Sequence, residues 1–95
     1  MSHLEKKSES PFFREFLLQE LTRRKGVNRA YSLRAFAKAM NLNPATLSQI
    51  LSGKANPTLR TTKKILEAIS IDSRNRRRFI HSVIATELQK VLGSS

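Results

Sequence analysis

The sequence contains no cysteine, no long apolar run and few acidic residues. Without cysteine, the chain has neither a disulfide framework nor a thiolate zinc site, which fits a reducing compartment. No apolar run approaches the ~20 residues that a membrane span requires. The N-terminal segment, MSHLEKKSES, is polar and lacks the apolar stretch of a secretory signal. We therefore expect a cytoplasmic protein with no membrane partner.

Residue patterns that carry catalysis are also missing. Of the two histidines, His3 falls in the polar N-terminal segment, and His81 has no acidic or cysteine partner nearby in the sequence. No glycine-rich phosphate loop, paired carboxylates or nucleophile-base arrangement is visible. We therefore expect no enzymatic activity, no cofactor and no metal site. His81 is interpreted as a packing or surface residue.

Basic residues dominate the charge of the chain. Eighteen Lys and Arg residues stand against seven Asp and Glu residues, which gives a formal net charge of +11. The sequence pI of about 11.2 exceeds the value of ~9 above which nucleic-acid binding is expected. The charge therefore favours a nucleic-acid partner. A merely soluble basic protein, or one attracted to anionic lipid, is the alternative at this point.

The chain is long enough for one domain with one modest core. Apolar residues recur at helical spacing in five segments, and no segment reads as a credible strand. The sequence therefore predicts an all-α domain over residues 11–92, after a disordered tail at residues 1–10. The predicted helices span residues 11–25, Leu33–Met40, Pro44–Leu51, Leu59–Ser70 and Arg74–Leu92.

Capping residues mark the ends of these helices. Ser10 is a predicted N-cap with Pro11 at the first helical position, and Gly26 is a predicted C-cap of the same helix. Asn41 is expected to adopt the left-handed conformation that ends the second helix. The predicted N-caps of the later helices are Ser32, Asn43, Thr58 and either Asp72 or Ser73.

Two short helices joined by a three-residue turn form the outline of a helix-turn-helix. Ala37 lies in the middle of the first helix, where a large side chain would hold the two helices apart. Leu42 in the turn is expected to point inward, and Leu47 and Ile50 are the predicted buried positions of the second helix. The residues between them are small or polar, so the second helix can lie against base edges. An ordinary helical hairpin at the surface is the alternative.

The segment SLRAFAKAMNLNPATLSQILSGKANPTLRTTKKILEAI, residues 32–69, resembles the phage-repressor (Cro-like) helix-turn-helix family. The resemblance implies a five-helix lambda-repressor-like DNA-binding domain, with the helix-turn-helix at the second and third helices. It also implies a transcriptional regulator that binds specific sequences of double-stranded DNA. The matching residues are Ser32, Phe36-Ala37, Asn41-Leu42, Thr46-Leu47-Ser48, Ile50-Leu51, Gly53, Lys54, Pro57 and Ile65 to Ile69.

Over a longer stretch, residues 11–92 look like the head of a bacterial regulator family. In that family an aromatic-rich first helix precedes a Tyr-Ser-x-Arg-x-Phe-Ala segment, which is found here at residues 31–37. A longer C-terminal domain usually follows in that family. We therefore expect this chain to be either a free-standing short member or a fragment.

The sequence departs from the family pattern in two places, in the turn and at the start of the recognition helix. Asn41 stands in place of the usual turn glycine, and Asn tolerates the left-handed conformation next best after Gly. Pro44 and Ala45 stand where relatives often carry Gln or another base-reading residue. Their side chains form no hydrogen bonds, but they can pack on a thymine methyl group. We therefore expect modest base specificity supported by strong backbone binding.

The predicted recognition helix, residues 44–51, enters the major groove by its N-terminal half. Gln49 is the best candidate for a bidentate contact to adenine. For Asn43 and Thr46 the alternative is capping and turn chemistry alone. The predicted base-reading residues are Asn43, Pro44, Ala45, Thr46, Ser48 and Gln49.

Basic and small polar residues around the recognition helix are predicted to clamp DNA phosphates. Lys54 follows Gly53, where the backbone can approach DNA closely. For the basic residues of the fourth helix, an ordinary solvated face is the alternative. The predicted phosphate contacts are Ser32, Arg34, Lys38, Ser52, Lys54, Asn56, Thr58 and Arg60.

The last predicted helix carries an apolar stripe wider than one small core needs. We expect it to form a homodimer, although the stripe can also simply close the core, and both can hold. A two-fold dimer would place two recognition helices ~34 Å apart to read a pseudo-palindrome. Four arginines, at positions 74 and 76–78, are interpreted as a contact for phosphate or an acidic partner, or as a solvated cluster. The predicted dimer contacts are Phe79, Val83, Ile84 and Leu88.

Two alternatives to a sequence-specific regulator stay open. One is a weakly specific protein that coats DNA or RNA. The other is an interaction module, in which the same fold binds an acidic protein, a nucleotide second messenger or another small effector. Selection of bound duplexes from a random pool distinguishes the regulator from the coating protein. Competition with heparin tests for the interaction module.

Overall fold

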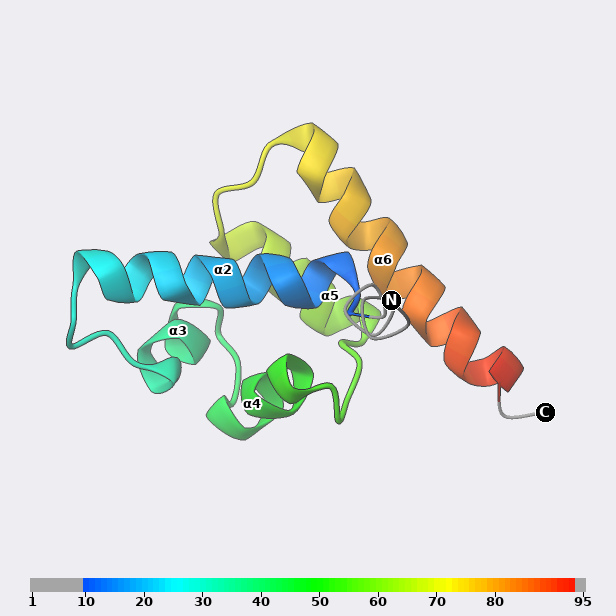
Figure 1. Ribbon diagram of the computed structural model, residues 1–95, viewed down its shortest axis with the longest axis horizontal. Helices are drawn as coiled ribbons and strands as arrows, with labels where there is room; N and C mark the ends of the chain where they lie inside the picture. Colours follow the sequence, from blue (N-terminus) through cyan, green and yellow to red (C-terminus); the bar gives the residue numbers. More distant parts are fainter. Residues whose placement is uncertain (1–9, 94–95) are drawn as a thin grey trace, which may run out of the picture.

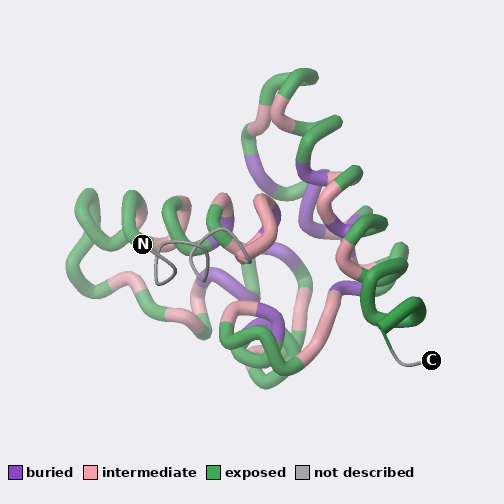
Figure 2. The backbone as a smooth tube through the Cα atoms, turned by 45° about the vertical axis from the view of Figure 1, so that its right-hand side comes forward, coloured by how far each residue is buried: buried purple, intermediate pink, exposed green. Residues whose placement is uncertain are grey.

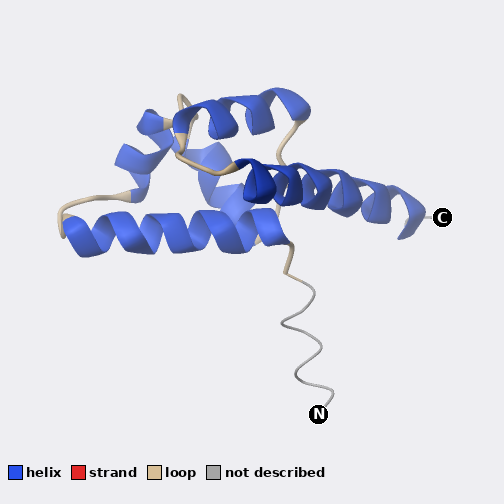
Figure 3. Cartoon of the chain, turned by 90° about the horizontal axis from the view of Figure 1, so that it is seen from above, coloured by secondary structure: helices blue, strands red, loops and turns tan. Residues whose placement is uncertain are grey.

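The computed structural model describes residues 10–93, and this part of the chain contains five α-helices and no strand (Figure 3). The predicted all-α class is therefore confirmed. The predicted tail lies outside the described residues, except for Ser10. Within the described range, no helix combines the length and the apolar character that crossing a bilayer demands. The helices are α2 (Phe12–Val27), α3 (Leu33–Ala39), α4 (Pro44–Ser52), α5 (Leu59–Ala68) and α6 (Ser73–Gly93).

Side-chain caps begin α3, α4 and α5 as predicted. The side chains of Ser32, Asn43 and Thr58 each accept a hydrogen bond from a backbone N–H two or three residues later, at 2.8–3.1 Å. Asp72 takes the same place before α6, where its carboxylate accepts from the backbone N–H of Asn75 at 3.4 Å. These bonds satisfy donors that the first turn of a helix leaves unpaired, so the chain breaks into separate helices at defined residues.

The start of α2 differs from the prediction. Pro11 is itself the N-cap residue, and it makes no side-chain cap bond. The hydroxyl of Ser10 donates instead to the carboxylate of Glu15, at 2.6 Å. The predicted Ser10 cap is therefore wrong, because the backbone N–H of Phe13 in the first turn donates instead to the hydroxyl of Ser82 in α6, at 3.0 Å.

The end of α2 also differs from the prediction. The helix continues through Gly26 to Val27, and Asn28 follows in an extended conformation. The backbone N–H of Asn28 still bonds the carbonyl of Arg24 at 3.0 Å, so helical pairing persists beyond the glycine. The predicted C-cap at Gly26 is therefore wrong. Within the described residues, Gly53 is the glycine that adopts a positive φ.

The buried core lies where the five helices meet (Figure 2). Phe13 of α2, Phe36 of α3 and Phe79 of α6 are its largest side chains, and all three are fully buried. The rings of Phe13 and Phe79 lie 6.1 Å apart, which joins the first helix to the last. Each such burial contributes about 1.5–3 kcal/mol to stability. The other core residues are Leu17, Ala37, Met40, Leu47, Ile50, Ile65, Leu66, Ile69 and Val83.

Only the first half of α6 contributes to this core. Phe79 and Val83 are 0% and 2% exposed, so neither has surface left for a second chain. The predictions of dimer contacts at these two residues are therefore wrong, because α6 packs through this face on α2 and α5. Ile84 and Leu88, which are 50% and 55% exposed, keep the surface that such a contact needs.

The arrangement of the helices leaves α4 at the edge of the domain. In Figure 1, α2 lies across the middle, with α3 and α4 below it and the first turns of α6 above it. α4 packs on α3 and on α2. One face of α4 is therefore fixed by two neighbours, and its opposite face is open to a partner.

Candidate nucleic-acid interface

A tight turn joins α3 to α4. Asn41 adopts the left-handed conformation predicted for it, with φ of 57°. The backbone N–H of Leu42 then bonds the carbonyl of Ala37 at 2.8 Å, and the Leu42 side chain packs against the core. Ala37 is fully buried between the two helices, where its single methyl group permits close packing. The turn therefore sets the angle at which α4 leaves α3.

α4 has one buried face and one exposed face. Leu47 and Ile50 are buried as predicted, and Leu51 is half-buried. The hydroxyl of Thr46 has no hydrogen-bond partner within residues 10–93, so capping does not occupy it. The exposed face carries no charge and only short or polar side chains, a composition that suits contact with base edges. Its residues are Ala45, Thr46, Ser48 and Gln49.

Asn43 and Pro44, the first residues of the predicted base-reading set, are less free to contact DNA than the residues that follow them. Pro44 is half-buried at the first position of α4, where a proline is expected. The Asn43 side chain is exposed, but its carbonyl oxygen accepts from the backbone N–H of Ala45 at 2.8 Å. Capping and base contact are compatible here, because the cap uses the oxygen and leaves the two amide N–H groups as donors.

A residue that the sequence analysis did not assign supports the end of α4. Nε of Arg14, in α2, donates to the carbonyl of Ile50 at 3.1 Å, and its guanidinium lies 5.4 Å from the centre of the Phe13 ring. A cation at this place also interacts favourably with the negative end of the α4 dipole. Nothing in the sequence pairs Arg14 with a carbonyl 36 residues away, so only the fold reveals this contact.

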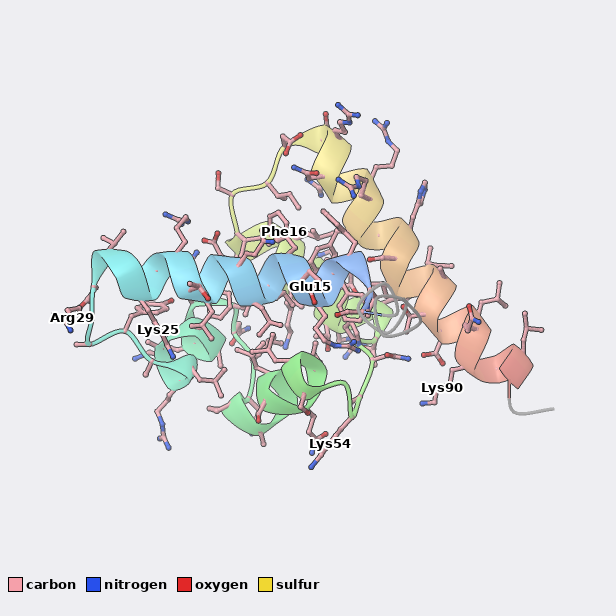
Figure 4. All side chains as sticks on the ribbon, in the orientation of Figure 1. Glu15, Phe16, Lys25, Arg29, Lys54 and Lys90 are labelled. Carbon is pink, nitrogen blue, oxygen red and sulfur yellow. The ribbon has the colours of Figure 1, made fainter. Side chains whose placement is uncertain are left out.

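Gly53 ends α4 and starts the loop that carries Lys54. Gly53 has φ of 87°, and the backbone N–H of Lys54 bonds the carbonyl of Gln49 at 2.9 Å. Figure 4 shows Lys54 at the outer edge of the domain, beside the end of α4. This position next to the exposed face agrees with a phosphate contact.

Cations also stand near the start of α4. Arg34 and Lys38 are exposed on α3, and together with residues 41–44 they line a shallow depression of about 420 Å³. Within residues 10–93, neither these two cations nor Lys54 forms an ion pair with a carboxylate. The exposed face of α4 therefore lies between uncompensated positive charges at both of its ends.

The other predicted phosphate contacts fall into two groups. Arg60 is exposed on the first turn of α5. The side chains of the four remaining polar residues bond within the protein: Ser32 and Thr58 as caps, Ser52 to the carbonyl of Gln49, and Asn56 to the carboxylate of Glu87 at 3.2 Å. These bonds orient the loops around α4, although Ser32, Ser52 and Thr58 are exposed to solvent as the cations are.

A network in α2 fixes the start of α3. Arg24 donates to the carboxylate of Glu20 and to the hydroxyl of Tyr31, both at 2.9 Å, and its guanidinium lies 5.1 Å from the Phe36 ring centre. Hydrogen bonds from Arg23 and Arg24 hold the pKa of Glu20 below its usual value, against the opposing effect of burial. Tyr31 belongs to the sequence motif at residues 31–37, and this contact gives that tyrosine a structural role.

The packed helix pair, the tight turn and the exposed polar helix between cations define a helix-turn-helix domain. A family model described as Helix-turn-helix matches residues 22–74, more than half of the chain. The chain therefore belongs to this family of DNA-binding transcription regulators, in its phage-repressor (Cro-like) form, which confirms the predicted resemblance. No curated protein and no solved structure matches the chain. Arg14 and most of α6 lie outside the matched range.

Proposed function

We propose that this protein binds specific sequences of double-stranded DNA as a transcriptional regulator, with α4 in the major groove. One observation supports the proposal above all. The open face of α4 is uncharged and carries short or polar side chains. The helix itself is held by α2 and α3, and cations without an ion pair flank it. A rigid helix with short side chains can approach base edges closely, and the cations draw the phosphate backbones to either side.

Base reading is assigned to the exposed face of α4. The carboxamide of Gln49 has the donor and acceptor pair that matches adenine in the major groove. Thr46 and Ser48 supply hydroxyl groups, and Ala45 offers a methyl group that suits thymine. Asn43 contributes amide donors at the edge of this face. With one long polar side chain in the set, base specificity is modest.

Phosphate binding is assigned to the exposed cations Arg34, Lys38, Lys54 and Arg60. Each phosphate that they neutralise adds about 0.9 to the slope of log affinity against log salt. Because such contacts do not depend on sequence, they supply most of the affinity and fix the register of α4 on the duplex. Gly53 lets the backbone beside Lys54 approach DNA closely.

We further propose that a second copy of this chain covers an apolar groove between the start of α5 and the second half of α6. The groove has a volume of about 440 Å³, and Leu59, Ile84, Leu88 and Val91 contribute to its lining. Leu59 is 75% exposed, although the helical spacing places it on the apolar face of α5. Both walls come from one chain, so a two-fold axis can set the α6 of each copy against the groove of the other.

Selection of bound duplexes from a random-sequence pool at about 0.15 M salt tests the proposed function. A sequence-specific regulator enriches a defined motif, and a dimer enriches one with two-fold symmetry. Absence of any enriched motif would instead indicate a coating protein. Duplex binding no tighter than heparin binding at this salt concentration would indicate an interaction module.

A further inference from the structure

A second concentration of positive charge lies on the first turns of α6. Arg74, Arg76, Arg77 and Arg78, named here the arginine patch, are all exposed. Within residues 10–93 none of the four forms an ion pair with a carboxylate. Asp72, the acidic residue closest in sequence, directs one carboxylate oxygen to the side-chain amide of Asn75 at 2.8 Å. The patch is therefore a site of uncompensated charge.

This charge opposes folding in two ways. Like charges three and four residues apart on one helix face repel each other, as Arg74, Arg77 and Arg78 do. The positive end of the α6 dipole adds to the repulsion, because cations are disfavoured at the start of a helix. An arrangement that costs stability in the free protein is expected where an anionic partner compensates it.

The arginine patch and α4 lie on opposite sides of the domain. In Figure 1 the first turns of α6 stand above α2, and α4 lies below it. Figure 4 shows nitrogen-tipped side chains around those first turns, far from Lys54 at the other edge. A duplex seated against α4 therefore does not reach the patch, so the patch needs a separate partner.

The surroundings of the patch favour a phosphate backbone over an acidic protein. The large exposed hydrophobic residues of the described chain all lie outside the first two turns of α6. Protein interfaces require an apolar centre, whereas interfaces with nucleic acid are polar and strongly positive. The Arg78 guanidinium lies 4.2 Å from the centre of the Phe12 ring and is thereby fixed in place. Arginine forks match phosphate oxygens in bidentate geometry.

We propose that the arginine patch binds the phosphate backbone of a second DNA duplex, so that one protomer bridges two duplexes. The inference rests on the proposed function in one respect, since α4 holds the first duplex. Binding at the patch is independent of sequence, because its groups are cations directed at phosphates. The protein then joins distant DNA segments, as looping or compaction of DNA requires.

A bridging experiment with the full chain tests this inference. One duplex of arbitrary mixed sequence is tethered to beads, and a fluorescent copy of the same duplex is added free in solution. Fluorescence is retained only when one protein assembly holds both duplexes. The test variant carries Arg74→Gln, Arg76→Gln and Arg77→Gln, and leaves Arg78 in place because it packs on Phe12. A matched variant with Lys at the three positions keeps the charge.

We expect the glutamine variant to capture about ten-fold less fluorescent duplex than the native chain at about 0.1 M salt. Its retention on the tethered duplex should change by less than about three-fold, because α4 is unaltered. The lysine variant should bridge within about three-fold of the native chain, because each lysine still neutralises a phosphate. Equal bridging by the glutamine variant and the native chain would overturn the inference. Bridging would then come from a dimer that holds a duplex at each α4, and the patch would serve another partner, such as an acidic protein.

Failure of the proposed function gives a different result. A variant with Arg34→Gln, Lys38→Gln and Lys54→Gln alters only the α4 side, because these three exposed cations are assigned to the phosphates of the first duplex. It should also lose bridging while it stays bound to one duplex through the patch. If this variant bridges normally and the glutamine variant does not, the patch binds DNA and the α4 assignment is wrong. If the reverse holds, the α4 assignment stands and the patch inference is overturned.

Discussion

The guanidinium of Arg14 donates a hydrogen bond to the backbone carbonyl of Ile50 at 3.1 Å and so joins α2 to the last turn of α4. The Ile50 carbonyl also accepts from the backbone N–H of Gly53 at 3.3 Å, so Arg14 supplies a second donor to this acceptor, and its cation meets the negative end of the α4 dipole. Arg14 is half-buried and also stacks against Phe13. The position of the candidate recognition helix thus depends on a residue outside the helix-turn-helix itself.

Replacement of Arg14 by Met should therefore lower the stability of the domain. Arg14→Met keeps much of the apolar stem but removes the bond to Ile50, and we expect the free energy of unfolding to fall by about 1–2 kcal/mol. Urea denaturation measures the change. Arg60→Met is the control, because Arg60 is exposed on α5, and it should stay within about 0.5 kcal/mol of the native chain. Equal stabilities for the two variants would show that the Arg14 contact contributes nothing.

The two glycines near the helix ends should respond to alanine with opposite signs. Gly53 has φ of 87°, so Gly53→Ala should cost about 1–2 kcal/mol of unfolding free energy. The backbone causes this cost, since an added Cβ would lie 3.5 Å from the Arg14 Cζ, which is an ordinary contact. Gly26 lies inside α2 with nothing within 4 Å of an added Cβ, so Gly26→Ala should stabilise by about 0.5–1 kcal/mol. Thermal and urea unfolding measure the change in unfolding free energy for both variants. If both changes had the same sign, this account would be wrong.

Asn43 offers a way to separate capping from DNA contact. Asn43→Ala removes the cap of α4 and should lower the unfolding free energy by about 1 kcal/mol. Asn43→Asp keeps a capping oxygen, so its stability should stay within about 0.5 kcal/mol of the native value. The new negative charge would face phosphates, and we expect duplex affinity to fall about ten-fold or more. Fluorescence anisotropy with a labelled duplex checks this, and an unchanged affinity for the Asp variant would place Asn43 away from DNA.

The features that the sequence predicts well are local in the chain. The caps at Ser32, Asn43 and Thr58 join a side-chain oxygen to an N–H at most three residues away, so a short motif contains the whole interaction. The buried positions Leu47 and Ile50 follow from helical periodicity within one short segment. The start of α4 and its division into a buried and an open face follow from these local features, and for that reason they could be inferred without coordinates.

The features that the sequence misses depend on distant partners. A stripe of apolar residues along α6 does not show that its first half is covered while Ile84 and Leu88 remain exposed, because this depends on where α2 and α5 lie. The Arg14 contact crosses 36 residues and has no motif. At Gly26 a local signal failed because helical pairing between Asn28 and Arg24 outweighs the usual preference of glycine for a helix end.

Gln49 and Lys54 should affect DNA binding in different ways. Gln49→Ala should reduce discrimination at one base position by about 1–3 kcal/mol, because the lost contact is to a base edge. Lys54→Ala should weaken binding to all sequences alike and lower the salt slope by about 1, because its contact is to a phosphate. Competition binding with single-base variants of the selected duplex, repeated over a salt series, distinguishes the two effects. If both variants bind as the native chain does, the recognition face lies elsewhere.

The apolar groove beside α6 predicts how the domain associates. Leu88 lines the groove and is 55% exposed, so Leu88→Glu should leave folding intact but place a charge in the dimer contact. We expect this variant to dimerise at least about ten-fold more weakly, because burial of an unpaired charge is costly. Val27→Glu is the matched control, since Val27 is 81% exposed at the far end of α2. Sedimentation over a concentration series measures both variants. A native chain that stays monomeric throughout, or a Leu88→Glu variant that dimerises as well as Val27→Glu, would show that the groove does not bind a second copy.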